Sequence, residues 1–175
     1  MPSLHIKLPT LELVLSKVYT THMPLLIKYV QKTSGPVAEF GGGFFSTPLL
    51  HWLCAEDRRE LFTYDDNLDI SSFLNGFSSR NHHIRYVKHW DEVDTKKKWD
   101  VLFIDHGVDC GLITEEARKQ TAIRFKNSAS YIIIHDTNEK EFTEDTAFWD
   151  NFKYKFHWRF ATPNTSVVSN FYEVD

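Results

Sequence analysis

The chain has 175 residues, of which 42% are hydrophobic and 25% charged, the balance of a water-soluble globular protein whose length fits one domain. Its formal net charge of −4 argues against nucleic acid or an anionic membrane as a partner. The sequence shows no signal peptide and no membrane span, and its two cysteines, Cys54 and Cys110, lack metal-ligand spacing. We therefore expect a cytoplasmic, intracellular protein with reduced thiols.

The first 35 residues are expected to form an N-terminal helical segment of a single domain that spans residues 1–175. Residues 11–19 have a weakly helical pattern, and Pro24 is expected to begin a helix that ends before Gly35-Pro36. From residue 36 to 175, strand and helix patterns alternate. The predicted helices begin near Pro48, Leu68 and Thr114, and the predicted strands cover residues 37–40, 60–64, 84–87, 101–104 and 131–134.

The C-terminal segment follows a different pattern. Residues 152–160 alternate strictly between aromatic and basic side chains, which predicts an edge strand with a basic solvent face. A nucleic-acid surface is the alternative explanation. Residues 165–171 form a second predicted strand after the turn at Pro163-Asn164. The whole pattern predicts an α/β protein whose parallel sheet is covered by helices on both faces and closed by an antiparallel hairpin.

Three consecutive glycines follow the first strand of the predicted sheet. Gly41, Gly42 and Gly43 let the backbone turn sharply and let a ligand approach closely. Thr47 is expected to be the N-cap of the next helix, with Pro48 as its first residue. A glycine turn before a helix N-terminus predicts a site for an anionic or carboxylate-bearing ligand, and a tight structural turn is the alternative.

Polar residues follow three other predicted strands, at the edge of the sheet where ligands of open α/β folds bind. They are Asp65-Asp66, Asp105-His106 and His135-Asp136. An acidic residue about two dozen positions beyond a glycine turn is typical of ribose recognition, which fits a dinucleotide or an adenosyl cofactor. Ser46 stands where a dinucleotide motif has its third glycine, so the adenosyl cofactor is favoured.

Four segments in this order resemble the successive motifs of class I S-adenosylmethionine (SAM)-dependent methyltransferases. They are residues 39–47 (EFGGGFFST), 64–66 (YDD), 99–106 (WDVLFIDH) and 132–137 (IIIHDT). The resemblance implies a three-layer Rossmann-like sandwich whose seven-stranded sheet has one antiparallel strand. It also implies cofactor contacts in order along SAM. The glycine turn, with Glu39, Ser46 and Thr47, would lie at its methionine end, and His89 and Trp90 near the adenine. Asp65 is the better candidate for the ribose and Asp66 the other, with a cap of the next helix as the alternative for one of them; Asp105 is a further cofactor contact.

A narrower resemblance is to cation-dependent, catechol-type O-methyltransferases. It implies that Asp105 and Asp136 hold Mg²⁺ or another divalent cation. The chain departs from that pattern at Gly107 and at Thr137, where the subfamily prefers a bulkier residue and an asparagine. Bystander carboxylates are the alternative for both aspartates.

These observations predict a SAM-dependent methyltransferase that acts on an oxygen of a small-molecule or sugar-like acceptor. His106, His135 and Asp136 are the candidate catalytic residues, because histidine titrates near neutral pH and the acceptor must lose a proton. Residues 107–113 and 138–145 are expected to cover the acceptor, and the site is either open or completed by a second subunit of a homo-oligomer. Two alternatives are a catalytically inactive scaffold with the same fold and a nucleotide-binding oxidoreductase.

Overall fold

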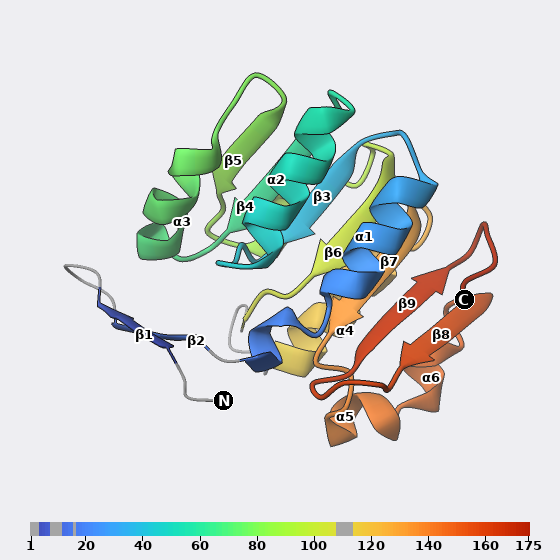
Figure 1. Cartoon of the computed structure of the whole chain (residues 1–175). Coiled ribbons are helices and arrows are strands. Elements are labelled where there is room, and N and C mark those ends of the chain that lie inside the picture. Colours follow the sequence, from blue (N-terminus) through green and yellow to red (C-terminus); the bar gives the residue numbers. More distant parts are fainter. Residues whose placement is uncertain (1–3, 8–11, 16, 108–113) are drawn as a thin grey trace.

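The computed structural model of the chain describes residues 4–7, 12–15, 17–107 and 114–175. Its centre is a sheet of seven strands in the order β5-β4-β3-β6-β7-β9-β8 (Figure 1). The strands are β3 (Val37–Phe40), β4 (Leu61–Asp65), β5 (His82–Tyr86), β6 (Trp99–Ile104), β7 (Ala129–His135), β8 (Tyr154–Trp158) and β9 (Thr165–Ser169). Strand β9 is the one strand of this sheet that runs opposite to the other six, so both of its pairings, with β7 and β8, are antiparallel. This confirms the predicted topology.

Helices pack on both faces of the sheet and complete a three-layer sandwich. Helices α1 (Met23–Lys32) and α2 (Ser46–Glu56) cover one face, and α4 (Thr114–Phe125) covers the other. Shorter helices are α3 (Leu68–Leu74), α5 (Lys140–Thr143) and α6 (Thr146–Trp149), with single 3₁₀ turns η1 (Lys17–Thr20), η2 (Asn75–Phe77) and η3 (Trp90–Glu92). No helix among the described residues is long and apolar enough to cross a bilayer.

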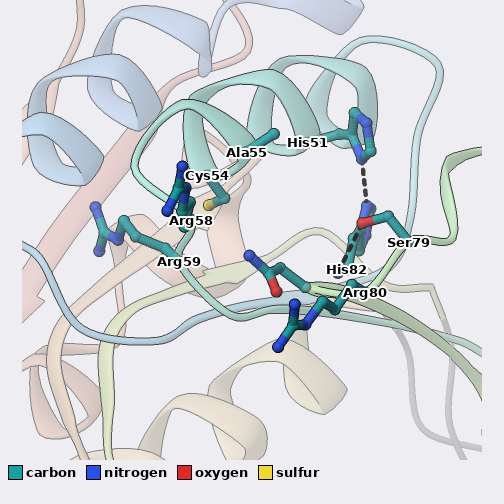
Figure 2. A pocket seen from close by; sticks show the side chains of 9 residues that line it. His51, Cys54, Ala55, Arg58, Arg59, Ser79, Arg80 and His82 are labelled. Carbon is teal, nitrogen blue, oxygen red and sulfur yellow. Dashed lines mark hydrogen bonds between the residues drawn. The ribbon is translucent and has the colours of Figure 1, made fainter.

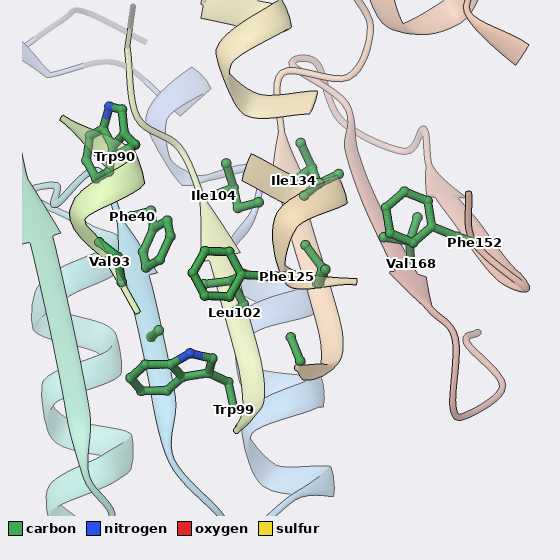
Figure 3. Packing of buried hydrophobic residues seen from close by; sticks show 14 of the residues in the cluster. Phe40, Trp90, Val93, Trp99, Leu102, Ile104, Phe125, Ile134, Phe152 and Val168 are labelled. Carbon is green, nitrogen blue, oxygen red and sulfur yellow. The ribbon is translucent and has the colours of Figure 1, made fainter. Parts of the chain in front are cut away.

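Strand β6 shows why the sheet needs helices on both faces. Its apolar side chains alternate in direction, as consecutive strand residues must. Val101 and Phe103 pack under α1 and α2, whereas Leu102 and Ile104 pack under α4. Figure 3 shows the cluster that contains Leu102 and Ile104, in which Phe125 of α4 lies over the sheet. A strand buried on both faces reads as a continuous apolar run, which is how the sequence predicted it.

Two local predictions are wrong. Residues 11–19 were expected to be weakly helical, but Glu12–Leu15 forms strand β2, paired antiparallel with β1 (Leu4–Lys7), and the helical part is the 3₁₀ turn that begins at Lys17. The period-two alternation of Leu11, Leu13 and Leu15 is a strand pattern that outweighs the weak helical one. Thr47 is not the N-cap of α2, because the helix begins at Ser46 after the cap residue Phe45. Its hydroxyl instead accepts a hydrogen bond from the N–H of Gly43.

Candidate functional site

The glycine turn joins the end of β3 to the start of α2. Gly41 has a φ of +87°, a conformation that favours glycine. A Cβ atom on Gly41 would lie 2.5 Å from the backbone nitrogen of His106, whereas one on Gly43 would meet only the Ser46 hydroxyl, at 3.0 Å. Gly41 is therefore required for packing against the end of β6, and Gly43 presents an open backbone on the other side of the turn.

A buried carboxyl group holds this turn from beneath. Glu39 is completely buried and accepts hydrogen bonds from the hydroxyls of Thr47 (2.8 Å) and Thr63 (2.7 Å). Burial raises the pKa of Glu39 to about 7, although these hydrogen bonds oppose the change. Through Thr47 the carboxyl group is linked to Gly43, so it fixes the shape of the turn from inside the protein.

Asp65 holds the turn from the side. One carboxylate oxygen accepts the N–H of Gly42 at 2.8 Å, and the other accepts the N–H of Asn67 at 2.8 Å. Asp65 is only 5% exposed, and this burial raises its pKa to about 6. Asp66, the next residue, has an exposed side chain. The predicted ribose pair thus contains one residue that shapes the turn and one that faces solvent.

The two residues predicted to lie near the adenine occupy different environments. The ring of Trp90 is buried between Phe40, at a centroid distance of 5.8 Å, and His106, at 4.3 Å. Both faces of the indole are covered, so it has no face left for a base to stack on. His89 is exposed, and its backbone N–H donates to the carboxylate of Glu92.

Arg118 of α4 connects the ends of β6 and β7. Its guanidinium lies 2.9 Å from Oδ1 of Asp105 and 2.7 Å from Oδ2 of Asp136, and it donates to the backbone carbonyls of Asp105, His106 and His135. The arginine side chain is 6% exposed, whereas those of Asp105 and Asp136 are 23% and 31% exposed. Burial alone would raise the pKa of Asp105, but His135 and Arg118 outweigh it and hold the pKa below its usual value.

Behind these carboxylates lies a pair of histidines. Nδ1 of His135 is 3.1 Å from Asp105 and 3.4 Å from Asp136, and its Nε2 is 3.0 Å from the hydroxyl of Thr21. His22 packs edge-on against the His135 ring, and neither of its buried ring nitrogens has a hydrogen-bond partner among the described residues. The pKa of His22 is lowered to about 4, mainly by burial and to a lesser extent by the nearby His135. His22 is therefore neutral at physiological pH.

His106, the third predicted catalytic residue in this region, points into the protein. It is 1% exposed, stacks on Trp90, and has Nε2 2.9 Å from the hydroxyl of Thr121. Its Nδ1 lies 3.0 Å from the carbonyl oxygen of Gly107. Both ring nitrogens therefore have protein partners, and the ring braces the end of β6 against α4.

The two aspartates predicted to hold a divalent cation, Asp105 and Asp136, are joined by a cationic side chain. Asp105 and Asp136 do not fit a shared Mg²⁺ site, because the Arg118 guanidinium already bridges them and repels a second positive charge. A different trio, His22, Asp105 and His135, offers ligand atoms that all lie within 4.8 Å of one another. Arg118 pairs with Asp105 and Thr21 with His135 without a metal, whereas the ring nitrogens of His22 have no partner within the described part of the chain.

Sequence reasoning missed Arg118 and His22. Arg118 follows Ala117 on α4 and both are buried, so the apolar neighbour was the available signal. His22 precedes the Pro24 helix and has no sequence signal of its own. Residues 108–113, predicted to cover the acceptor, and Cys110 lie outside the described residues. Cys54 is buried, and burial raises the pKa of its thiol to about 11.

Comparison with known proteins gives a fold but no close relative. No protein-family model matches the sequence, and no curated protein matches it. Solved structures do match. The METTL16 methyltransferase domain has a TM-score of 0.65 at 9% identity, over 91% of this chain and 71% of that one. The N-terminal domain of human METTL16 in complex with S-adenosylhomocysteine (SAH) has a TM-score of 0.64 at 9% identity, covering 95% and 76%.

A third similar structure is a ribosomal protein L11 methylase from Lactobacillus delbrueckii subsp. bulgaricus. It has a TM-score of 0.62 at 12% identity, over 89% of this chain and 80% of that one. At such identities the likeness establishes the fold. The chain has the class I SAM-dependent methyltransferase fold, as the order of its sequence motifs predicted.

Proposed function

We propose that the protein is a SAM-dependent methyltransferase that transfers a methyl group to an oxygen of a small-molecule acceptor. The observation that carries the proposal is the packing of the glycine turn directly against the end of β6. The absent side chain of Gly41 makes room for the backbone of Asp105 and His106. This packing joins the turn proposed to hold the cofactor to the polar cluster proposed to hold the acceptor.

The turn has the features that a cofactor with a carboxylate and a ribose needs. Its backbone is held by Glu39 and Asp65 from within, so it is formed before a ligand arrives. Gly43 leaves its open side accessible, and the proposed ribose contacts come from Asp65 and Asp66, with His89 near the adenine. When bound, the sulfonium of SAM supplies an activated methyl group, so the protein needs mainly to align the acceptor.

In the proposed reaction an acceptor O–H loses its proton, an O–CH₃ bond forms and the S–CH₃ bond breaks. We assign orientation of the acceptor hydroxyl to the partly exposed carboxylates of Asp105 and Asp136, which Arg118 holds in place. Asp136 has a φ of +58°, unfavourable for a non-glycine residue, and its ion pair with Arg118 offsets this strain. His135, in contact with both carboxylates, is the proposed proton acceptor, and His106 positions the strand end.

The choice of acceptor is the open part of the proposal. The catalytic domain of human METTL16, which resembles this chain with a TM-score of 0.64, was solved in complex with a MAT2A 3′UTR hairpin. The net charge of −4 and the acidic pair at the proposed acceptor site favour a small neutral or cationic molecule over a polyanion for this chain. A turnover screen should still include a hairpin RNA and a protein acceptor.

Two experiments test the proposal. Calorimetry with SAM, SAH and NAD is expected to show binding of both adenosyl compounds and not of NAD, and the opposite result would favour an oxidoreductase. Transfer of a labelled methyl group is then screened over hydroxyl-bearing compounds, with and without EDTA. The Asp136→Asn variant should lower turnover and leave SAH affinity unchanged. Cofactor binding without turnover on any acceptor would favour a non-catalytic scaffold.

A further inference from the structure

A cavity lies at the opposite end of the sheet from the glycine turn. It has a volume of about 720 Å³ and is lined by α2, the residues that follow it, and the start of β5 (Figure 2). His82 begins β5 and pairs in register with Leu61, the first residue of β4, whereas Asp65 of the proposed cofactor site ends β4. Four strand residues separate these positions by roughly 13 Å. The cavity is therefore distinct from the proposed methyl-transfer site.

The lining of this cavity is positively charged and contains no carboxylate among its nine residues. Arg58 and Arg80 are exposed, and neither guanidinium makes an ion pair or hydrogen bond with any of the described residues. Arg59 differs, because it is buried and its guanidinium donates to the backbone carbonyls of Val30, Thr33 and Gly35. Two arginines are therefore available to a ligand, and a third fixes the wall behind them.

Arg58 occupies a position where glycine is preferred. It has a φ of +54° at the C-terminal cap of α2. Its N–H bonds to the carbonyl of Ala55 and the N–H of Arg59 to that of Cys54, the pattern of a Schellman cap in which the left-handed residue is commonly glycine. The cap also satisfies two of the last carbonyls of the helix, which would otherwise repel an anion. Arg58 therefore presents its guanidinium to the cavity from a backbone position that glycine would occupy with less strain.

A series of hydrogen bonds through His82 and Thr63 fixes the imidazole ring of His51, which lines the cavity. Nδ1 of His51 is 3.0 Å from Nδ1 of His82, and Nε2 of His82 is 2.9 Å from the hydroxyl of Thr63. Because Thr63 donates its hydroxyl hydrogen to Glu39, His82 donates through Nε2 and accepts through Nδ1. His51 then donates through Nδ1, and its Nε2 is the ring nitrogen left outside this series.

We propose that this cavity binds a phosphate-bearing small molecule, with Arg58 and Arg80 as the groups that contact the phosphate. Guanidinium groups match the oxygens of phosphate in geometry and charge, and two unpaired arginines balance a dianion. The volume lies within the range of small-molecule sites, so an organic group attached to the phosphate also fits. The amide of Asn81 and the His51 ring supply further polar contacts for that group.

The test is calorimetric titration of the full chain with inorganic phosphate, glucose 6-phosphate and uncharged glucose. We expect saturable binding of both phosphates and none of glucose. Arg58→Gly and Arg80→Gln should each weaken binding about tenfold, because each removes a charge-assisted contact. Arg58→Gly also relieves the strained cap, so its melting temperature should equal or exceed that of the unaltered protein and a loss of binding cannot come from unfolding.

Arg159→Gln is the matched control, because it removes the same charge beyond β8, at the other edge of the sheet. Its phosphate affinity should be unchanged. SAH affinity should be unchanged in all three variants, which separates this site from the proposed methyl-transfer site. An absence of saturable phosphate binding, or an equal loss in Arg159→Gln, would overturn the proposal.

Discussion

The buried carboxyl group of Glu39 makes stability depend on pH in a way that one substitution can isolate. Burial raises its pKa from 4.5 to about 7, so the folded protein resists its ionisation. The protonated carboxyl group contributes stability that is fully present below pH 4.5, the pKa of Glu39 in the unfolded chain. This stability is lost as the pH rises through about 7, the pKa in the folded protein. Glu39→Gln keeps an oxygen that can accept from Thr47 and Thr63 and removes the charge.

The size of the effect follows from the two pKa values. Relative to the unaltered protein, Glu39→Gln should gain about 1 kcal/mol of unfolding free energy at pH 5 and about 3 kcal/mol at pH 8. The trend with pH is the informative quantity, because the fixed cost of placing an amide in this site is the same at both values. Any such cost shifts the whole curve and leaves its slope intact.

Urea unfolding followed by tryptophan fluorescence at several pH values between 5 and 8 measures this difference. Glu56→Gln is the control, since Glu56 is exposed on α2 and its substitution should give no trend with pH. A flat difference for Glu39→Gln across this range would refute the reasoning, because it would mean that the buried carboxyl group ionises as easily in the folded as in the unfolded chain.

Three other substitutions test the supports of the site. Gly41→Ala should lower the free energy of unfolding by about 3 kcal/mol and the melting temperature by several degrees. The reason is that its Cβ would lie 2.5 Å from the backbone nitrogen of His106, at a residue with a positive φ. An unchanged melting temperature would contradict this packing. Arg118→Met should lower the free energy of unfolding, measured in urea at pH 7, by about 3 kcal/mol, because two carboxylates lose their cation. A decrease of less than about 1 kcal/mol would show that the ion pairs are weak. His22 has its pKa lowered to about 4, so its protonation should cost the unaltered protein up to about 3 kcal/mol relative to His22→Phe as pH falls from 6.5 towards 4. Parallel pH profiles of the two proteins would argue against the buried neutral ring.

The sheet could be predicted from the sequence because its signals are local. Apolar runs such as residues 101–104, the glycine turn and the polar strand ends each depend on neighbours in the chain, and their order determines the topology. The strand boundaries differ from prediction by one or two residues, as at β6, where Trp99 extends the strand. The seven-stranded architecture and the single antiparallel strand are confirmed.

The interior of the site could not be predicted, because it depends on contacts between distant residues. Thr47 was expected to cap a helix, but its hydroxyl is used by Gly43 and Glu39. Trp90 was expected near an adenine, but Phe40 and His106 cover both its faces. Only the folded chain shows such pairings. The candidate catalytic residues and the cofactor contacts therefore stay predictions that the variants above can test.

The central claim is that the glycine turn holds an adenosyl cofactor, and Gly43→Ala tests it most directly. Its Cβ would meet only the Ser46 hydroxyl, at 3.0 Å, so the variant should fold with a nearly unchanged melting temperature. The added methyl group lies on the side of the turn where the cofactor is proposed to approach. Titration calorimetry with SAH should show binding to the unaltered protein and an affinity at least tenfold lower, about 1.4 kcal/mol, for the variant. Equal affinities, or no SAH binding to the unaltered protein, would contradict the account.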